Sequence, residues 1–333
     1  MTDKLTFVSV VFDAEVTLLE LQARSMRMFL APDAVDKIIV LDNCLLGLGS
    51  RRRARLLDAY GVHAPKVSFV PTRDLFDPGA TSGWRSQQAA KLLISSRVRT
   101  PDYIALDAKN HFTRPVTSAD FVGDDGRARG RSHPYDQHPL RSSLVHTIEY
   151  LGGDKAMVEG AVRAFPPTAT PFVLRTSVVQ ELIRDIEESS GRPFAVEFED
   201  RRLLEFFLYS GWATVRGPGL PALRNESPLT SPTVWPKAAH LQGVEDTIAE
   251  ARDSGAFVFA VHRQALAHAD RATLDRVARH WVGIGLFRDV KEVKRFLGRF
   301  KRSYTPALAL TRSAERIQRL TRKIPFTSRR AHA

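Results

Sequence analysis

The sequence predicts an α/β fold in which a mainly parallel sheet is flanked by helices. Four short apolar runs in the first third of the chain alternate with longer segments whose apolar residues have helical spacing. Strands that alternate with helices favour parallel pairing, with helices on both faces of the sheet. The expected strands are residues 5–11, 37–41, 66–70 and 103–106, and the expected helices between them are 15–30, 51–60 and 83–98.

The composition indicates a globular protein with one large domain and an appendage. The chain has 333 residues, 43% of them hydrophobic, and no run of about 18 apolar residues that could cross a bilayer. No export signal follows Met1, and the lone Cys44 has neither a disulfide partner nor Cys or His at zinc-ligand spacing. We therefore expect a cytoplasmic protein, with peripheral contact to the inner face of the membrane as a further option.

The basic charge is concentrated at the C-terminal end. Of the net charge of +12, residues 288–333 supply +11, from 14 Lys or Arg and 3 Asp or Glu. We therefore expect a near-neutral catalytic domain over residues 1–287 and a basic helical extension over residues 288–333. A neutral body whose aromatic residues are not interleaved with Lys and Arg argues against nucleic acid as a partner.

The extension has the pattern of an amphipathic helix. Apolar residues recur at helical spacing among many Lys and Arg, at Val290, Val293, Leu297 and Phe300. Pro306 is expected to end this helix, and a second set of apolar positions follows at Ile317, Leu320 and Ile324. Cationic helices of this kind bind anionic membrane surfaces, so we expect the tail to anchor the protein there. The alternative is that residues 290–300 pack on the body.

Polar residues follow several of the expected strands. Asp13 comes after the first strand, Asp42 after the second and Asp107 after the fourth. Ligands of parallel sheets bind beyond the carboxyl ends of the strands, so these positions mark the expected site. Residues 123–139, which are rich in Gly, Arg, His, Asp and Pro, form either a surface loop or a mobile lid over that site.

The segment around Asp107 resembles a known motif. Residues 103–112, followed by Arg114 and Pro115, resemble the Asp-X-Asp region of GT-A glycosyltransferases, in which an acidic strand tip lies beside a sugar nucleotide. The wider array resembles an uncharacterised bacterial family related to those enzymes, and this likeness covers residues 5–287. Its further segments are residues 7–11, 83–92, 171–174, 205–209 and 261–263.

The resemblance implies a fold, an activity and partners. The implied fold is GT-A-like, with a Rossmann-like sheet. The implied activity is transfer of a sugar from a nucleotide-diphosphate donor to a cell-surface polysaccharide or glycolipid acceptor. The implied cofactor is either none or a divalent cation, Mn2+ or Mg2+.

Lys109 stands where the motif has its second acid. That acid usually helps to bind a cation that offsets the charge of the departing diphosphate, and an ammonium would repel such a cation. In one interpretation Lys109 is catalytic and supplies the positive charge itself. In the other, Lys109 points away, and Asp107, Asn110 and His262 hold a metal.

The donor-binding residues come partly from the resemblance. It implies that Phe12 contacts the nucleotide base and that Asp13 contacts the ribose, with Asp42 as a second contact. Without the resemblance, Asp13 is an acid that is favourable at a helix N-terminus.

Four residues of the expected helix 83–98 share one face, at spacings of three and four. They are Trp84, Gln87, Gln88 and Lys91. An aromatic ring, two amides and an ammonium suit sugar hydroxyls and phosphate. The alternative is a solvated face on which Trp84 is a packing anchor.

An acidic cluster precedes an aromatic run. It contains Glu197, Glu199, Asp200 and Glu205. An inverting transfer needs a carboxylate that takes the proton of the attacking hydroxyl. Glu205 matches the acid-before-aromatic pattern of the family and is the candidate base or acceptor ligand, whereas the alternative is an ion-paired surface. His262, which follows the strand 257–261, is a candidate contact for metal or phosphate, or a structural residue.

Other functions stay open at this point. A nucleotidyltransferase normally has a Gly-rich basic loop after its first strand, and residues 11–15 lack one. A non-catalytic nucleotide-sugar-binding protein would need the same donor-binding residues. A basic nucleic-acid-binding protein is the alternative from a different class.

Overall fold

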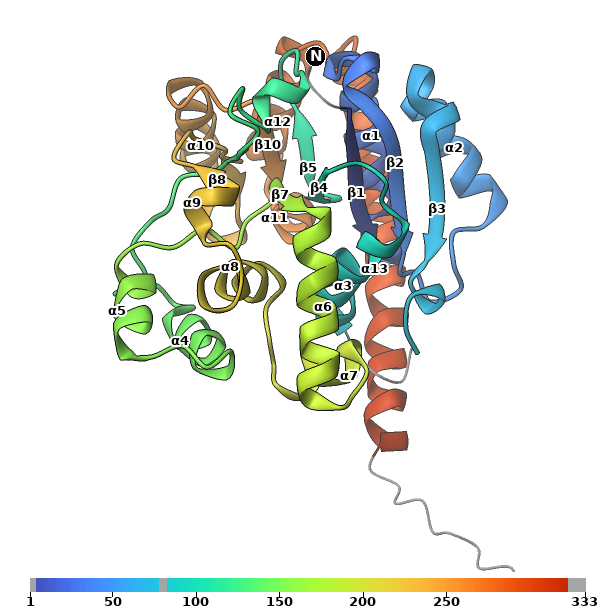
Figure 1. The fold of residues 1–333 in the computed structure, drawn as a ribbon. Helices are drawn as coiled ribbons and strands as arrows, with labels where there is room; N and C mark the ends of the chain where they lie inside the picture. The colour runs from blue at the N-terminus through green and yellow to red at the C-terminus, as the bar shows by residue number, and fades with distance from the viewer. Residues whose placement is uncertain (1–3, 78–82, 323–333) are drawn as a thin grey trace, which may run out of the picture.

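The central element of the molecule is a five-stranded sheet of order β3-β2-β1-β4-β7. The computed structural model describes residues 4–77 and 83–322 (Figure 1). The strands are β1 (Leu5–Val11), β2 (Val35–Asp42), β3 (Val67–Pro71), β4 (Asp102–Asp107) and β7 (Phe172–Arg175). The first four are parallel, and β7 pairs antiparallel with β4. The predicted fold class, a mainly parallel sheet flanked by helices, is confirmed.

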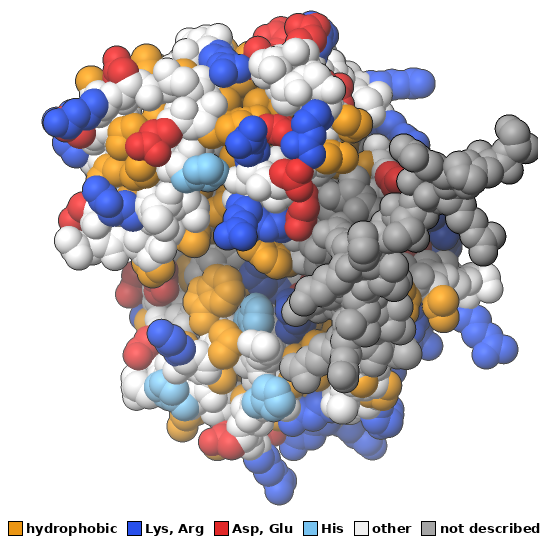
Figure 2. All heavy atoms as spheres, turned by 90° about the horizontal axis from the view of Figure 1, so that it is seen from below, with side chains coloured by type: hydrophobic (Ala, Val, Ile, Leu, Met, Phe, Trp, Pro, Cys, Tyr) orange, Lys and Arg blue, Asp and Glu red, His pale blue; other side chains and the backbone are white. Residues whose placement is uncertain are grey.

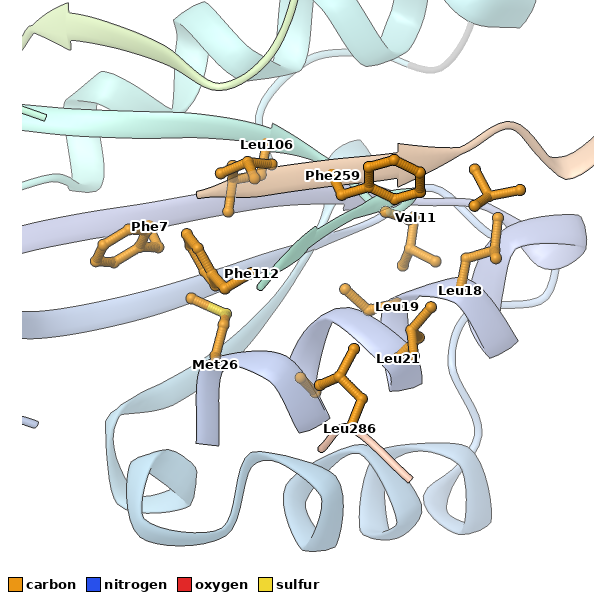
Figure 3. Packing of buried hydrophobic residues seen from close by; sticks show 14 of the residues in the cluster. Phe7, Val11, Leu18, Leu19, Leu21, Met26, Leu106, Phe112, Phe259 and Leu286 are labelled. Atoms are coloured by element: carbon orange, nitrogen blue, oxygen red, sulfur yellow. The ribbon is translucent and has the colours of Figure 1, made fainter. Parts of the chain in front are cut away.

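Alternate side chains of β1 enter two different cores. Phe7 and Val11 belong to one cluster, and Val8 and Val10 to the other, because successive side chains of a strand point to opposite faces. Figure 3 shows the first core between β1 and α1. The helices over it are α1 (Val16–Phe29), α2 (Ser50–Tyr60) and α12 (Arg271–Gly283). The helices over the second core are α3 (Gly83–Leu93), α6 (Thr176–Ser190), α7 (Phe194–Asp200) and α8 (Glu205–Val215).

A small second sheet brings a distant segment to the end of β4. Directly after the turn of Ala108 and Lys109, β5 (Asn110–Phe112) pairs antiparallel with β10 (Val258–Val261). β10 pairs in parallel with β9 (Thr233–Val234). The residue after β10 therefore lies beside the turn after β4. The remaining elements are α4 (Arg141–Tyr150), α5 (Lys155–Arg163), α9 (Leu220–Leu223), α10 (Leu241–Asp253), α11 (Arg263–His268), α13 (Val290–Arg322), and the paired β6 (Ala128–Arg129) and β8 (Arg224–Asn225).

The segment 123–139 is anchored to the body. Its strand β6 pairs with β8. Tyr135 is buried, with its ring 5.3 Å from that of Phe207, and its hydroxyl donates to the carbonyl of Pro166 at 2.9 Å. These contacts contradict the interpretation of this segment as a mobile lid.

Helix α13 corrects two expectations for the C-terminal segment. Pro306 lies inside the continuous helix, although its ring nitrogen cannot donate a backbone hydrogen bond. Tyr304 and Ala307 on either side of Pro306 are buried against the body, which holds the helix in register there. Val293 and Phe300 are buried in the same core as β1, so the apolar face of this helix is not available to a membrane. The alternative in which residues 290–300 pack on the body is confirmed.

For the last part of the tail, the structure describes the backbone as far as Arg322 and the side chains as far as Ala309. The side chains of Ile317 and Leu320, and the whole of Ile324, lie outside the described residues, so the second apolar segment stays a prediction. Within residues 4–77 and 83–322, no helix combines the length and the apolar character that crossing a bilayer requires.

Truncation tests the packing of α13. A chain that ends at Arg288 loses the buried side chains of this helix and is expected to unfold or precipitate, because large apolar cavities remain. A chain that ends at Ala309 keeps those side chains and is expected to melt within a few degrees of the full-length protein. Circular dichroism melting compares the three proteins. Equal melting temperatures for all three would contradict a structural role of α13.

Protonation of a buried histidine in the unfolded chain is expected to lower the stability of the folded protein in acid. His111 is buried and accepts a hydrogen bond from Trp281 Nε1 at 3.0 Å. Burial, and then the nearby His280, lowers the pKa of His111 from 6.5 to about 3. The unfolded chain therefore binds a proton near pH 6.5 that the folded protein does not, so stability is full above that pH and falls as the pH drops toward 3. From pH 7 to pH 5 we expect this residue to lower the free energy of unfolding by about 2 kcal/mol.

Urea unfolding at the two pH values measures this loss. His111→Gln keeps an acceptor for Trp281 but cannot titrate, so its stability should change less between pH 7 and pH 5. An equal change in the variant and the parent would exclude His111 as the cause.

Candidate active site

The candidate site lies at the carboxyl edge of the parallel sheet. β1, β2 and β4 end there at Val11, Asp42 and Asp107, and the pairing of β10 with β5 brings His262 beside them. Figure 2 views the molecule from this side. It shows a hollow between two halves of the surface, with hydrophobic, His, and Lys or Arg side chains along it.

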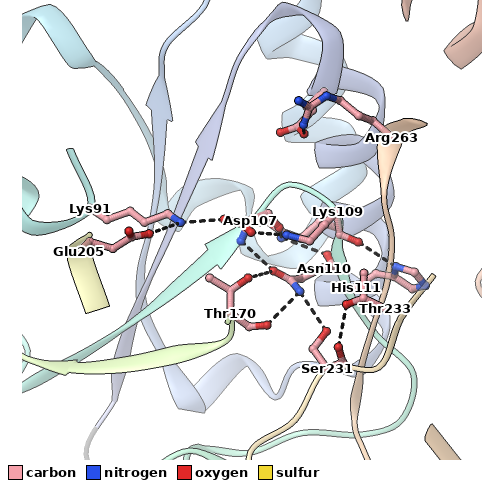
Figure 4. A network of polar contacts seen from close by, with 12 residues as sticks. Lys91, Asp107, Lys109, Asn110, His111, Thr170, Glu205, Ser231, Thr233 and Arg263 are labelled. Carbon is pink, nitrogen blue, oxygen red and sulfur yellow. Dashed lines mark hydrogen bonds and ion pairs between the residues drawn. The ribbon is translucent and has the colours of Figure 1, made fainter. Parts of the chain in front are cut away.

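Four charged side chains form a chain of contacts at this edge of the sheet (Figure 4). Lys91 Nζ on α3 lies 2.8 Å from Asp107 Oδ1 and 3.2 Å from Glu205 Oε1 on α8. Lys109 Nζ donates to the other oxygen of Asp107, Oδ2. The side chains of Lys91 and Glu205 are 6% and 10% exposed, whereas that of Asp107 is 32% exposed. Asp107 is therefore the more solvent-exposed member of its ion pair with Lys91.

The surroundings shift the pKa values of three of these groups. Burial raises the pKa of Glu205, and the ammonium of Lys91 only partly offsets this effect. Burial would also raise the pKa of Asp107, but Lys109 and Lys91 together outweigh it and hold this pKa below its usual range. Burial opposes the charge of Lys91, yet Asp107 and Glu205 raise its pKa above the ordinary value. Near neutral pH the site therefore holds a charged lysine and aspartate beside a glutamate that protonates unusually easily.

Asn110 holds the turn after β4. Its Oδ1 accepts from the backbone N–H of Asp107 at 2.8 Å and from Thr170 Oγ1 at 2.7 Å. Its Nδ2 donates to the carbonyl of Thr170 at 3.3 Å and to Ser231 Oγ at 3.1 Å. Both ends of the amide are thus engaged, which makes Asn110 a positioning residue for the turn.

Gln22 supports the same turn from α1. Its Nε2 donates to the backbone carbonyls of Asp107 at 2.8 Å and of Asn110 at 3.1 Å, and its Oε1 accepts from Ser9 Oγ. Gln22 is fully buried, and sequence reasoning missed it. The available signal was an amide between Leu21 and Ala23 on an otherwise largely apolar segment, since a buried polar group needs partners.

The residues proposed as metal ligands do not fit a divalent cation. Each carboxylate oxygen of Asp107 faces an ammonium, and the amide of Asn110 is fully engaged. His262 Nδ1 accepts from the backbone N–H of Gln264 at 3.3 Å, so its proton sits on Nε2, which is then a donor. In the part of the chain that the structure describes, no three or more His, Cys, Asp or Glu are arranged to hold a metal.

Further hydrogen-bond donors lie beside Lys109. Burial, Arg263 and Lys109 lower the pKa of His262 to about 4, so its imidazole is neutral near pH 7. Trp235 lies 5.5 Å from the ring of His262, and Lys109 Nζ lies 5.6 Å from the centre of the Trp235 ring. Trp235 was missed by sequence reasoning, although a large exposed aromatic in a Pro-rich connector is a recognisable signal.

Phe12 is paired with an arginine rather than open on both faces. The guanidinium of Arg263 lies 4.9 Å from the centre of its ring. Arg263 Nη1 also binds Glu15 Oε1 at 2.6 Å, and burial raises the pKa of Glu15. Neither Glu15 nor Arg263 was predicted as a site residue, because their pairing joins segments separated by most of the chain.

Asp13 and Asp42 hold the loop between β2 and α2. Asp42 accepts from the backbone N–H of Leu48 at 2.6 Å, and its side chain is 1% exposed. Asp13 accepts from the backbone N–H of Leu45 at 2.9 Å and pairs with Arg52 at 2.9 Å. The Asp42 carboxylate is buried and binds backbone amides of its own loop, so it has no free face for a ribose, whereas the Asp13 side chain is 13% exposed and its ribose contact stays a prediction.

The predicted polar face of α3 is divided between the interior and the surface. Gln88 is buried and accepts from the backbone N–H of Glu205 at 3.4 Å, and Lys91 belongs to the charged network. Trp84 is exposed and Gln87 is half-buried. Trp84 is therefore not a packing anchor.

The acidic cluster near α7 is divided in the same way. Glu197 pairs with Arg192 at 3.0 Å and with Arg201 at 2.8 Å, and Asp200 also pairs with Arg192. Glu197 and Asp200 are therefore ion-paired, in agreement with the alternative interpretation of the acidic cluster. Glu205 alone of this set reaches Lys91 and, through it, Asp107.

Comparison with solved structures finds similar architectures at low sequence identity. The galactosyltransferase LgtC, in complex with donor and acceptor sugar analogues, is 14% identical, with 89% of this chain and 96% of that chain covered and a TM-score of 0.48. The bifunctional glycosyltransferase WbbM is 11% identical, with 89% and 52% covered and a TM-score of 0.44. Glucosyl-3-phosphoglycerate synthase from Mycobacterium tuberculosis, in complex with Mn2+, uridine diphosphate and glucosyl-3-phosphoglycerate, is 12% identical, with 66% and 68% covered and a TM-score of 0.37. These solved proteins are GT-A glycosyltransferases, the class that the sequence resembles.

The family comparison covers most of the sheet and the charged network. No curated protein matches this sequence. A family described as a family of unknown function, DUF6492, matches residues 11–220, which include Lys91, Asp107, Lys109 and Glu205. The chain therefore belongs to the family of unknown function DUF6492.

Proposed function

We propose that this protein is a glycosyltransferase that moves a sugar from a nucleotide-diphosphate donor to a cell-surface polysaccharide or glycolipid. The observation that carries the proposal is the group of cationic and neutral donors around Asp107 at the carboxyl edge of the sheet. Lys109 Nζ, His262 Nε2 and Arg263 come from the ends of β4 and β10, which the small sheet holds together. Such a group suits the oxygens of a diphosphate, and Asp107 beside it suits sugar hydroxyls.

The remaining donor contacts are assigned by exposure. Phe12 is only 9% exposed and packs in the first core, so its proposed contact with the nucleotide base is limited to this small exposed part of the side chain. Trp84 and Gln87 are accessible at the rim and would meet the sugar, whereas Gln88 would act through Glu205. Asp13 and Asp42 would shape the donor site through the loop that they hold.

The geometry also favours transfer without a divalent cation. Lys91 already fixes Asp107 at one oxygen, so Lys109 is free to exchange its contact with Asp107 for the diphosphate as negative charge develops on the leaving group. The charge is preorganised, because the turn that carries Lys109 is held by Asn110 and Gln22. A fixed positive charge stabilises a developing anion without bound metal.

Removing Lys109 tests this electrostatic role. Lys109→Ala is expected to lower turnover by about 10², while a chelator leaves the parent enzyme active. Lys37→Ala, which removes an exposed lysine of β2, is the matched control and should retain parental turnover. Loss of parental activity in chelator, with recovery in Mn2+, would contradict the proposed role.

Glu205 is proposed as the base for the acceptor hydroxyl. Its raised pKa favours proton uptake, and it lies one side chain away from Asp107 across Lys91. An acceptor that docks at this point would lie on the α8 side of the donor.

The tail is proposed to bind an anionic membrane surface through exposed cations rather than through an apolar face. Lys291, Lys294, Arg295, Lys301 and Arg302 are exposed on α13. We propose that the functional extension consists of this exposed face together with residues 310–333. The chain that ends at Ala309 should therefore bind anionic vesicles more weakly than the full-length protein.

Ligand binding decides the donor class. A thermal-shift screen of nucleoside diphosphates and their sugars, with and without Mn2+, should give a rise in melting temperature for one nucleotide series. Slow hydrolysis of the matching sugar nucleotide should accompany it. Binding without hydrolysis or transfer would indicate a non-catalytic nucleotide-sugar-binding protein. Failure of every nucleotide, together with salt-sensitive binding of RNA or DNA, would overturn the proposal.

A further inference from the structure

The loop between β2 and α2 presents two leucines to solvent. Leu45 is 53% exposed and Leu46 is 90% exposed. The backbone N–H of Leu45 donates to Asp13 and that of Leu48 donates to buried Asp42, so the loop is held on both sides of Leu46. The loop conformation therefore keeps both leucine side chains in water.

Scattered exposed leucines are common on proteins and need no explanation. Two consecutive leucines on a loop fixed by two carboxylates are a different case, because the interactions that order the loop do not involve these side chains. An ordered apolar tip of this kind can enter an apolar phase with little further loss of conformational freedom.

The adjacent helix start is strongly cationic. Residues 43–57 contain four arginines and no acid. Arg52 pairs with Asp13 and Arg53 lies 3.6 Å from Asp42, which leaves these two partly neutralised. Arg51 and Arg55 are exposed, and neither has an ion pair among the residues that the structure describes.

This apolar and cationic element lies on the same side of the molecule as the candidate active site. It follows the carboxyl end of β2, and that edge also carries Asp107 at the end of β4. In Figure 1, α13 runs past the same ends of the parallel strands. Two elements from opposite ends of the chain thus extend to the side on which the site opens.

We propose that this edge rests on an anionic phospholipid surface, with Leu45 and Leu46 entering the boundary between headgroups and acyl chains. Arg51 and Arg55 would lie beside the lipid phosphates, where each cation contributes to the attraction. A second copy of the chain would bring arginines against arginines, and a nucleic acid would leave the leucines in water, so lipid fits both features best. The inference goes beyond the proposed transfer reaction, because it assigns membrane contact to the first domain and not only to the tail.

Vesicle binding by the full-length protein tests the proposal. Co-sedimentation is measured with phosphatidylcholine vesicles that either contain or lack phosphatidylglycerol. The double variant Leu45→Asn/Leu46→Asn should bind the anionic vesicles about a hundredfold or more weaker than the parent, as expected for losing the burial of two apolar side chains. Val62→Asn replaces another exposed apolar residue, 62% exposed on the turn after α2, and should bind like the parent.

The arginines are tested separately. Arg51→Gln/Arg55→Gln should also weaken binding about tenfold or more, and added salt should reduce the difference from the parent. Arg99→Gln/Arg279→Gln removes the same charge from exposed positions on other segments and is the matched control. Equal vesicle binding by the parent and both loop variants would overturn the proposal. So would a loop-dependent dimer in light scattering without any vesicle binding, because the occupant would then be a second copy.

The outcome is independent of the proposed transfer reaction. Hydrolysis of a sugar nucleotide, measured without vesicles, should be unchanged in the Arg51→Gln/Arg55→Gln variant, whose exposed side chains on α2 have no part in the donor site. If hydrolysis is absent in every protein but vesicle binding still depends on the leucines, the proposed function fails and the membrane contact stands.

Discussion

Replacing Lys91 by Met is expected to lower the free energy of unfolding by about 3 to 5 kcal/mol, because it leaves the buried carboxylate of Glu205 without its counter-charge. Asp107 keeps Lys109 as a partner, so the lost stabilisation comes mainly from the contact between Lys91 and buried Glu205. Turnover should fall as well, because Asp107 loses the contact that fixes one of its oxygens. Urea unfolding and single-turnover rates measure the two effects.

The double variant Lys91→Met/Glu205→Gln is the decisive control. It removes both buried charges together, so it should recover most of the stability that Lys91→Met loses. Simple additivity of the two single substitutions would contradict a coupled ion pair between α3 and α8.

Glu205→Gln is expected to lower sugar transfer by about 10² to 10⁴, the range for loss of a general base, while nucleotide affinity stays within a factor of about two to three of the parent. Burial raises the pKa of Glu205, so the acidic limb of the parental rate profile should lie above the ordinary glutamate range near 4.5. The limb should disappear in the variant. Rates must be compared below the melting temperature of each protein, because the substitution also alters the contact with Lys91.

Asp200→Asn is the matched control for this experiment. Asp200 lies in the same acidic cluster of the sequence but pairs with Arg192 on the surface. Its substitution should leave transfer unchanged. Unchanged transfer in Glu205→Gln would exclude Glu205 as the base, and the ion pairs of Glu197 and Asp200 make those two residues poor replacements.

The sequence predicted the sheet well because the sheet depends on local pattern. The apolar runs around Phe7 and Ile39 are short, continuous and followed by segments of helical periodicity, and such runs become buried parallel strands. The C-terminal helix was harder, because burial of Phe300 depends on a surface formed by distant residues. A helical apolar pattern predicts the helix but not whether protein or lipid covers it.

The candidate site was predicted in part for a similar reason. Asp107 and Lys109 follow from a strand end and a motif, and both lie at the carboxyl edge of the sheet. The partners that decide their chemistry come from far away in the sequence: Lys91 from α3, Glu205 from α8 and His262 after β10. Pairings between segments of this kind leave no periodic signal, which is why Arg263 with Glu15 was missed and why Asp42 was expected at the ligand rather than within its own loop.

The way the turn after β4 is held has a consequence for how such sites change during evolution. Gln22 binds the main-chain carbonyls of residues 107 and 110, and Asn110 binds the main-chain N–H of residue 107. None of these bonds uses the side chain at position 109. One codon change at that position can therefore exchange an ammonium for a carboxylate while the backbone stays in place. A lineage could therefore pass from the proposed lysine-assisted site to a metal-assisted one by two changes, this one and a second that releases Asp107 from the lysine of α3.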